Sequence, residues 1–176
     1  QMNNTTEDSS ADLGQHLRSS SNISTDQSNL ERINRWKCAL RMFAVKPNAG
    51  WGPGTYQFKY APFQKASEKT VISTDFGDAG NAHSEYLGAL SESGWPGALI
   101  FTAIMLSAAF TGIKVWYRGK RDKAGYFILA IVTGLMTYAV HGLMNSFLDS
   151  DKIAALCWGY IALIVASDTG ADREPV

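Results

Sequence analysis

The pattern of hydrophobic and polar positions changes near residue 94 of this 176-residue chain. Residues 95–117, whose only charge is Lys114, and residues 124–148, which lack Asp, Glu, Lys and Arg, are each long enough to cross a hydrocarbon core of about 30 Å. Residues 153–167 are also uncharged but are shorter than a usual span. Because a soluble helix needs a polar stripe and these runs have none, we predict three transmembrane helices.

The charges that flank these runs predict their orientation. Residues 118–123 carry four basic side chains in one short loop, and such loops remain in the cytoplasm. Residues 73–94 instead carry four acidic side chains and no Lys or Arg. The polar half of the chain is therefore expected outside the cytoplasm. ATP is absent there, so any transfer reaction needs an activated donor, usually a lipid-linked one.

Whole-chain averages conceal this division, because 45% hydrophobic residues, 18% charged residues and zero net charge are typical of a soluble domain. Residues 1–27 are rich in Ser, Asn, Thr, Asp and Gln, which is typical of a linker. The start of the chain has neither the basic nor the apolar segment of a signal peptide. We therefore expect a C-terminal fragment, inactive alone, with further membrane helices upstream.

A helix is predicted over residues 28–45. Ser28 and Glu31 match a capping box, and the Gly- and Pro-rich residues 47–54 end the helical pattern. At about 100° per residue, one apolar stripe is expected to be buried. This stripe comprises Ile33, Trp36, Leu40 and Phe43.

Arg32 lies at the edge of that stripe, near the N-terminus of the predicted helix. Backbone N–H groups and the helix dipole favour an anion there. Arg32, assisted by Arg35, is therefore a candidate ligand for a pyrophosphate. The alternative is that both arginines only solvate the helix or pair with Glu31.

His83 is a candidate general base. Asn81 is expected to cap a short helix that extends to Leu90, with His83 in its first turn. A helix N-terminus disfavours imidazolium, so the neutral form with its free lone pair is expected. The alternative is a surface histidine in a polar loop.

His141 is an ionisable residue inside the second predicted span, with Tyr138, Asn145 and Asp149 at helical offsets on one face. Such a residue is a functional candidate and is expected to face the bundle interior. The alternative is a hydrogen bond that holds two helices together.

The sequence predicts no metal site, no cofactor and no nucleic-acid partner. His16, His83 and His141 are scattered, and neither Cys38 nor Cys157 has a partner at ligand spacing. Residues 47–54 lack the Gly-Lys-Ser/Thr of a nucleotide-binding P-loop.

Three motifs in order resemble one protein family. They are Arg32-x3-Trp36-x2-Ala39-Leu40-x-Met42-Phe43, Pro47-x2-Gly50-x-Gly52-x-Gly54, and Ala82-His83-Ser84-x-Tyr86-Leu87-x4-Glu92-x-Gly94-x2-Gly97. Together with the hydrophobic pattern that follows, over about residues 31–166, they resemble the O-antigen ligase and polymerase superfamily.

This resemblance implies a bacterial inner-membrane enzyme that moves a glycan from undecaprenyl diphosphate to an acceptor hydroxyl on the periplasmic face, without nucleotide or metal. It implies that Arg32 engages the diphosphate and that His83 activates the acceptor. Ser84 stands where the family usually has Asn, so an amide contact is replaced by a hydroxyl or lost. The acceptor stays open: a lipid A core sugar for a ligase, a growing lipid-linked chain for a polymerase, or a protein side chain.

The expected fold is all-α, an integral membrane bundle of three C-terminal transmembrane helices preceded by a partly helical periplasmic loop. The expected segments are a linker (1–27), an active-site loop (28–94), spans (95–117, 124–148, 153–167), a cytoplasmic loop (118–123), a periplasmic turn (149–152) and a cytoplasmic tail (168–176).

The expected catalytic residues are His83 and Arg32. The expected substrate-binding residues are Arg35, Asn81, Ser84, Tyr86, Glu92, His141 and Asn145. The expected partners are the lipid-linked donor, a glycan or lipid A core acceptor, and the bilayer. Two alternatives from other classes are a polysaccharide transporter or flippase component, and a structural membrane subunit.

Overall fold

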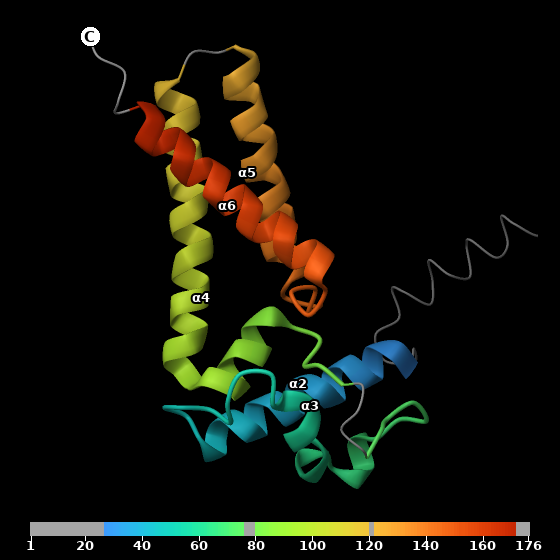
Figure 1. The fold of residues 1–176 in the computed structure, drawn as a ribbon. Coiled ribbons are helices and arrows are strands. Elements are labelled where there is room, and N and C mark those ends of the chain that lie inside the picture. Colours follow the sequence, from blue (N-terminus) through green and yellow to red (C-terminus); the bar gives the residue numbers. More distant parts are fainter. Residues whose placement is uncertain (1–26, 76–79, 120–121, 172–176) are drawn as a thin grey trace, which may run out of the picture.

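The structure, a computed structural model, describes residues 27–75, 80–119 and 122–171 (Figure 1). The long helices are α2 (Gln27–Val45), α4 (Glu85–Arg118), α5 (Lys123–His141) and α6 (Asp151–Ala171). The short ones are α3 (Tyr56–Lys59) and the 3₁₀ helices η1 (Ala61–Phe63) and η2 (Ala66–Glu68). No strand occurs in the described ranges, and the predicted all-α class is confirmed. Nearly all of the predicted linker 1–27 lies outside the described residues.

Helices α4, α5 and α6 form a bundle with an apolar core, and all three are long and apolar enough to cross a membrane. Gly112 allows α4 and α5 to approach closely, because a Cβ there would lie 2.3 Å from Cγ2 of Val132. Large apolar side chains also cover the outside of the bundle, as a lipid environment requires. The buried core comprises Met105, Ala108, Ile128, Ile131, Val132, Leu135, Cys157 and Ile164.

The helix ends differ from the ends of the apolar runs. Helix α4 begins ten residues before residue 95, with a kink at Gly94, because Ser84 provides an N-cap upstream. Helix α5 ends at His141, so residues 142–148 do not continue the second helix. Helix α6 extends beyond 153–167 at both ends. Hydropathy marks the apolar stretch of a helix, whereas caps and turns mark its ends.

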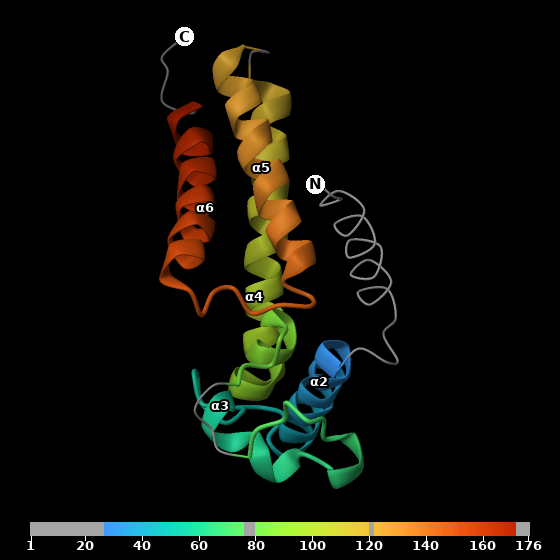
Figure 2. The same cartoon turned by 90° about the vertical axis from the view of Figure 1, so that its right-hand side faces the viewer.

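The head, residues 27–75 and 80–84, packs across one end of α4, with α2 and α3 beside the first turns of that helix (Figure 2). Its apolar core is small and includes two stacked tyrosines, Tyr56 and Tyr60, with ring centroids 5.4 Å apart. The remaining core residues are Cys38, Ala39, Met42 and Ala82.

The buried face of α2 is not the predicted apolar stripe. Leu40 is 48% exposed, and the other three residues of that stripe are only half-buried. The prediction was wrong because residues 56–75 fold over a polar face of α2 and satisfy its hydrogen bonds. That buried face comprises Glu31, Asn34, Arg35, Cys38, Ala39 and Met42. Ser28 lies inside α2, so it is not the predicted N-cap.

The Gly-rich loop 47–54 docks on the kink in α4. The backbone N–H groups of Trp51 and Gly52 donate to the carbonyls of Ser91 and Glu92, at 3.1 and 2.8 Å. A Cβ on Gly50 would lie 2.3 Å from the backbone of Glu92. Gly94 has φ +68°, and its own Cβ would lie 2.4 Å from the carbonyl oxygen of Pro47. The absence of side chains at Gly50 and Gly94 therefore allows the head to pack closely against the bundle.

Candidate active site

Arg32 and His83 lie close together where α2 passes the start of α4. Trp36, one helical turn after Arg32, donates from Nε1 to the backbone carbonyl of His83 at 3.0 Å. Nη1 of Arg32 donates to Oδ1 of Asn29 at 3.1 Å, whereas its buried Nε has no partner within the described residues. The two predicted catalytic residues are thus neighbours, with part of the guanidinium unpaired.

His83 has a backbone conformation that is rare for a residue with a side chain. Its φ is +48°, in the left-handed region. Such strain costs about 1–3 kcal/mol and persists only where the surroundings hold it. Here Oδ1 of Asn81 accepts the N–H of His83 at 3.0 Å, and Trp36 binds its carbonyl. Across the described ranges, no group hydrogen-bonds to the imidazole, which leaves its nitrogens available.

The pKa of the His83 imidazole lies below its ordinary value. Burial lowers this pKa most, followed by the positive charges of Arg32 and Arg35, and Glu31 opposes them. A neutral imidazole has a lone pair that accepts a proton, as a general base requires. The sequence also predicted a neutral imidazole, but for another reason, a helix N-terminus.

The predicted N-cap, Asn81, is wrong, and the pKa of His83 is therefore lowered by something other than a helix N-terminus. Ser84 caps α4, because its Oγ accepts the N–H of Leu87 at 3.3 Å. Asn81 lies outside the helix, and His83 precedes the first turn instead of lying in it. Burial and the charges of Arg32 and Arg35, and not the helix dipole, therefore lower the pKa of the imidazole.

The turn between α5 and α6 supports the segment that carries His83. Nδ2 of Asn81 donates to Oδ2 of Asp149 at 3.0 Å, and the N–H of Ser84 donates to Oγ of Ser146 at 3.0 Å. The sequence did not single out Ser146, because this residue lies inside the predicted span 124–148, whereas α5 ends at His141.

Arg35 lies in a buried polar network of the head. It is 4% exposed, and its Nε donates to Oε1 of Glu31 at 2.7 Å. Nη2 donates to Oγ1 of Thr74 at 3.1 Å, and the guanidinium carbon lies 4.0 Å from the ring centroid of Tyr60. The pKa of Glu31 is lowered: burial would raise it, but hydrogen bonds from Ser73, Arg35 and others outweigh burial. Little of Arg35 remains accessible to a ligand.

Tyr86 and Glu92 bind protein groups. The hydroxyl of Tyr86 donates to the carbonyl of Ala139 at 3.1 Å, which joins α4 to α5. The Glu92 carboxylate accepts the N–H groups of Gly54 and Tyr56, at 2.9 and 2.8 Å. Tyr86 therefore joins two helices of the bundle, and Glu92 joins the head to the bundle. Their predicted contact with substrate stays a prediction.

In the described residues, the side chains of His141 and Asn145 make no hydrogen bond to Arg32 or His83, although Gly142, next to His141, accepts the N–H of Glu85 at 2.9 Å. His141 is the last residue of α5 and is exposed, beside an apolar pocket of about 280 Å³. Residues 142–150 leave the helix, so the predicted helical face shared with Asn145 and Asp149 does not exist.

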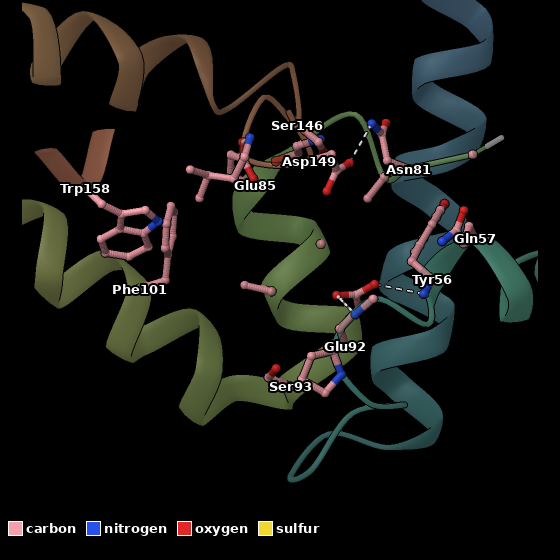
Figure 3. A pocket seen from close by; sticks show the side chains of 18 residues that line it. Tyr56, Gln57, Asn81, Glu85, Glu92, Ser93, Phe101, Ser146, Asp149 and Trp158 are labelled. Atoms are coloured by element: carbon pink, nitrogen blue, oxygen red, sulfur yellow. Dashed lines mark hydrogen bonds between the residues drawn. The ribbon is translucent and has the colours of Figure 1, made fainter. Parts of the chain in front are cut away.

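A cavity of about 910 Å³ lies between the head, the start of α4 and the turn before α6 (Figure 3). Gly80, Asn81, Ala82 and Ser84 line it, but His83 does not. No α2 residue lines the cavity, whereas the charges that act on the imidazole all come from α2. The imidazole is therefore on the α2 side of residues 80–84, and the cavity lies on the other side. Sequence reasoning placed Asn81, Ser84 and Glu92 in the site but missed most of the lining, including Gln57, Phe101, Ser146 and Trp158.

Residues 27–75, 80–119 and 122–171 contain no group of three or more His, Cys, Asp or Glu side chains that could hold a metal ion. Cys38 and Cys157 are both free and buried.

Comparisons with known proteins locate the chain in one family. No curated protein and no solved structure matches it. The family model described as O-antigen ligase matches residues 3–102. The match includes Arg32, His83, the Gly-rich loop and the kink in α4. The chain therefore belongs to the O-antigen ligase family, a family of membrane proteins that act on lipid-linked glycans.

Proposed function

We propose that this protein transfers a glycan from undecaprenyl diphosphate to an acceptor hydroxyl on the periplasmic face of the bacterial inner membrane. The family supports the glycan chemistry, and the basic loop between the first two apolar helices supports the orientation. The observation that carries the proposal is the proximity of Arg32 to His83, whose backbone carbonyl is bound by Trp36, one helical turn after Arg32. It places a cation with an unpaired donor beside an imidazole of lowered pKa.

In the proposed reaction, neutral His83 takes the proton from the acceptor hydroxyl. The acceptor oxygen attacks the anomeric carbon in line with the leaving group, and a new glycosidic bond forms. The bond between that carbon and the diphosphate oxygen breaks, and the lipid diphosphate leaves. Arg32 stabilises the negative charge on the leaving group by charge-assisted hydrogen bonds.

Arg35 contributes to this proposal through its charge and position. Its Nε and Nη2 bind Glu31 and Thr74, its guanidinium lies over the Tyr60 ring, and its buried Nη1 has no partner in the described residues. Because Arg35 is almost fully buried, it acts on His83 through its charge, which lowers the pKa of the imidazole. Asn81 and Ser84 act as positioning residues, since they connect the segment that carries His83 to the α5–α6 turn.

Complementation of a deletion strain tests the proposal with the full-length protein. His83→Asn is the sharpest variant, because Asn tolerates the left-handed backbone at this position but is no base. We expect that His83→Asn and Arg32→Ala fail to restore transfer in the deletion strain while the protein remains in the membrane. Lys37→Ala, on the exposed side of α2, is the matched control and should transfer normally.

The glycan products distinguish the alternatives. Loss of a ligase leaves lipid-linked polymer unattached, whereas loss of a polymerase reduces the ladder to single repeats. A transporter instead predicts normal transfer in His83→Asn and failed export in His141→Ala. A structural subunit predicts that neither substitution changes any glycan, and either of these last two outcomes would refute the proposal.

A further inference from the structure

The cavity of about 910 Å³ has a size typical of a ligand-binding site. It lies on the side of residues 80–84 opposite to the His83 imidazole, because Asn81 and Ser84 line it and His83 does not. A molecule in this cavity is therefore close to the proposed reaction site, but its bound part is not the part that reacts.

The charge of the lining differs from that of the Arg32 side. Three carboxylates line the cavity, those of Glu85, Glu92 and Asp149, and its described lining contains no Lys, Arg or His. A diphosphate would meet charges of its own sign there, without a cation to compensate. The cavity thus disfavours the charged part of a lipid-linked donor.

The other lining groups suit an uncharged polyol. Gln57 and Asn81 bring amides from the head, and Phe101 and Trp158 bring aromatic rings at the opposite end of the cavity (Figure 3). The amide of Gln57 makes no hydrogen bond to the described residues, so both its donor and its acceptor are available. Amides bind sugar hydroxyls, and aromatic rings pack against the apolar C–H faces of sugar rings.

We propose that this cavity binds uncharged sugar units of the glycan substrate, beyond the unit that reacts at His83. The inference rests on the proposed transfer reaction and adds a subsite and its ligand chemistry. Those units come from either the donor glycan or the acceptor glycan. Their binding strengthens the enzyme–substrate complex without changing the reacting groups.

Kinetics of the reconstituted full-length protein test this subsite. Gln57→Ala and Trp158→Leu change side chains that are partly exposed, so both variants should fold. For substrates several sugar units long, we expect KM to rise about tenfold with kcat unchanged. Lys59→Ala on the same short helix and Phe127→Leu on α5, both exposed and outside the cavity, are matched controls that should keep the wild-type KM.

Substrate length identifies the source of the bound sugars. Donors and acceptors are each shortened to one sugar unit in turn, and the substrate whose shortening removes the effect of Gln57→Ala is the one that occupies the cavity. An unchanged KM for long substrates in both variants would overturn the proposal. An equal rise in KM with one-unit donor and acceptor would also overturn it, because the effect would then arise from the fold.

A competition experiment tests the charge. A free uncharged oligosaccharide should inhibit the wild-type protein and inhibit Trp158→Leu less. An oligosaccharide of equal length with a carboxylate on each unit should inhibit neither, and equal inhibition by both sugars would contradict the inference.

His83→Asn separates the two proposals. If it is inactive while the cavity variants behave as wild type, only the subsite is wrong. If His83→Asn transfers glycan normally, the proposed reaction is wrong, and the subsite inference, which rests on that reaction, falls with it.

Discussion

The head and the bundle are held together by different interactions. In the head, Glu31 and Arg35 are 5% and 4% exposed and form an ion pair, surrounded by hydroxyl and amide groups of residues 60–74. In the bundle, apolar side chains such as Leu135 fill the core, and lipid is expected to cover the outside. The head thus depends on directional polar contacts and the bundle on packing.

This difference determines how each region tolerates change. Removal of one partner of a buried polar pair leaves the other partner desolvated and unpaired. Removal of an apolar side chain leaves a space that neighbours partly fill. The candidate catalytic residues lie on the head, where exact hydrogen-bond partners hold the backbone of His83 in place.

Each region contains one buried cysteine, which reports on its opening. Cys38 is 0% exposed in the head core, and Cys157 is 3% exposed in the bundle core. Burial raises the pKa of the Cys38 thiol to about 11, which further suppresses its reaction. Labelling rates with a membrane-permeable maleimide therefore measure local opening in both regions of one protein.

Glu31→Ala should have the largest effect on the head. The substitution leaves Arg35 buried without its carboxylate, which costs about 3–5 kcal/mol. We expect labelling of Cys38 to accelerate at least a hundredfold while labelling of Cys157 stays unchanged. Wild-type protection of Cys38 in this variant would show that the polar network does not hold the head.

Leu135→Ala is the matched experiment in the bundle. Leu135 is 0% exposed, and its truncation costs about 2–5 kcal/mol. Labelling of Cys157 should accelerate, and that of Cys38 should not. Equal acceleration of both cysteines would mean that head and bundle open as one unit, which contradicts the comparison.

Gly94→Ala tests the junction between the two regions. A Cβ there would require a residue with a side chain at φ +68° and would lie 2.4 Å from the Pro47 carbonyl oxygen, at a cost of about 1–3 kcal/mol. A cysteine introduced by Ser91→Cys, at a position that is 0% exposed, should label faster in this variant. Gly159→Ala, whose Cβ would meet nothing within 4 Å, is the control and should leave this rate unchanged.

The pH dependence of transfer should respond more modestly. His83 loses its function as a base when it is protonated, so kcat/KM should fall as the pH decreases through the pKa of His83. Because this pKa is lowered by burial and then by Arg32, the fall should occur below about pH 6.5. Arg32→Gln should shift it to higher pH, measured on the residual activity, and Lys37→Gln should not. An unshifted pH profile in Arg32→Gln would show that the charge of Arg32 does not act on the His83 imidazole.

The bundle was largely predictable from the sequence, and the buried face of the head was not. Lipid-spanning helices are recognised by hydropathy alone, so all three were found, although caps and turns moved their ends. On α2, the rule that apolar residues are buried selected Leu40 and Phe43. The structure instead buries Glu31 and Asn34, because their partners lie 30 to 42 residues away in the chain. A helical pattern contains no information on such distant partners.

The candidate site was predictable where a short motif carries it. Arg32 and His83 were selected from their motifs and lie together, but the cause of the lowered pKa of His83 was not foreseen. The Gly-rich pattern indicated a tight loop, but the contact of this loop with Glu92 and with the kink in α4 is visible only in the structure. The cavity was missed because its lining comes from four separate parts of the chain, including Trp158.

The most direct test of the central claim is the initial rate of glycan transfer by purified full-length His83→Asn protein with a defined lipid-linked donor. We predict a decrease of about 10²- to 10⁴-fold, the usual contribution of a general base, with Cys38 as protected from maleimide as in the wild type. A rate within twofold of the wild-type rate, with Cys38 still protected, would show that the neighbour of Arg32 is not the base.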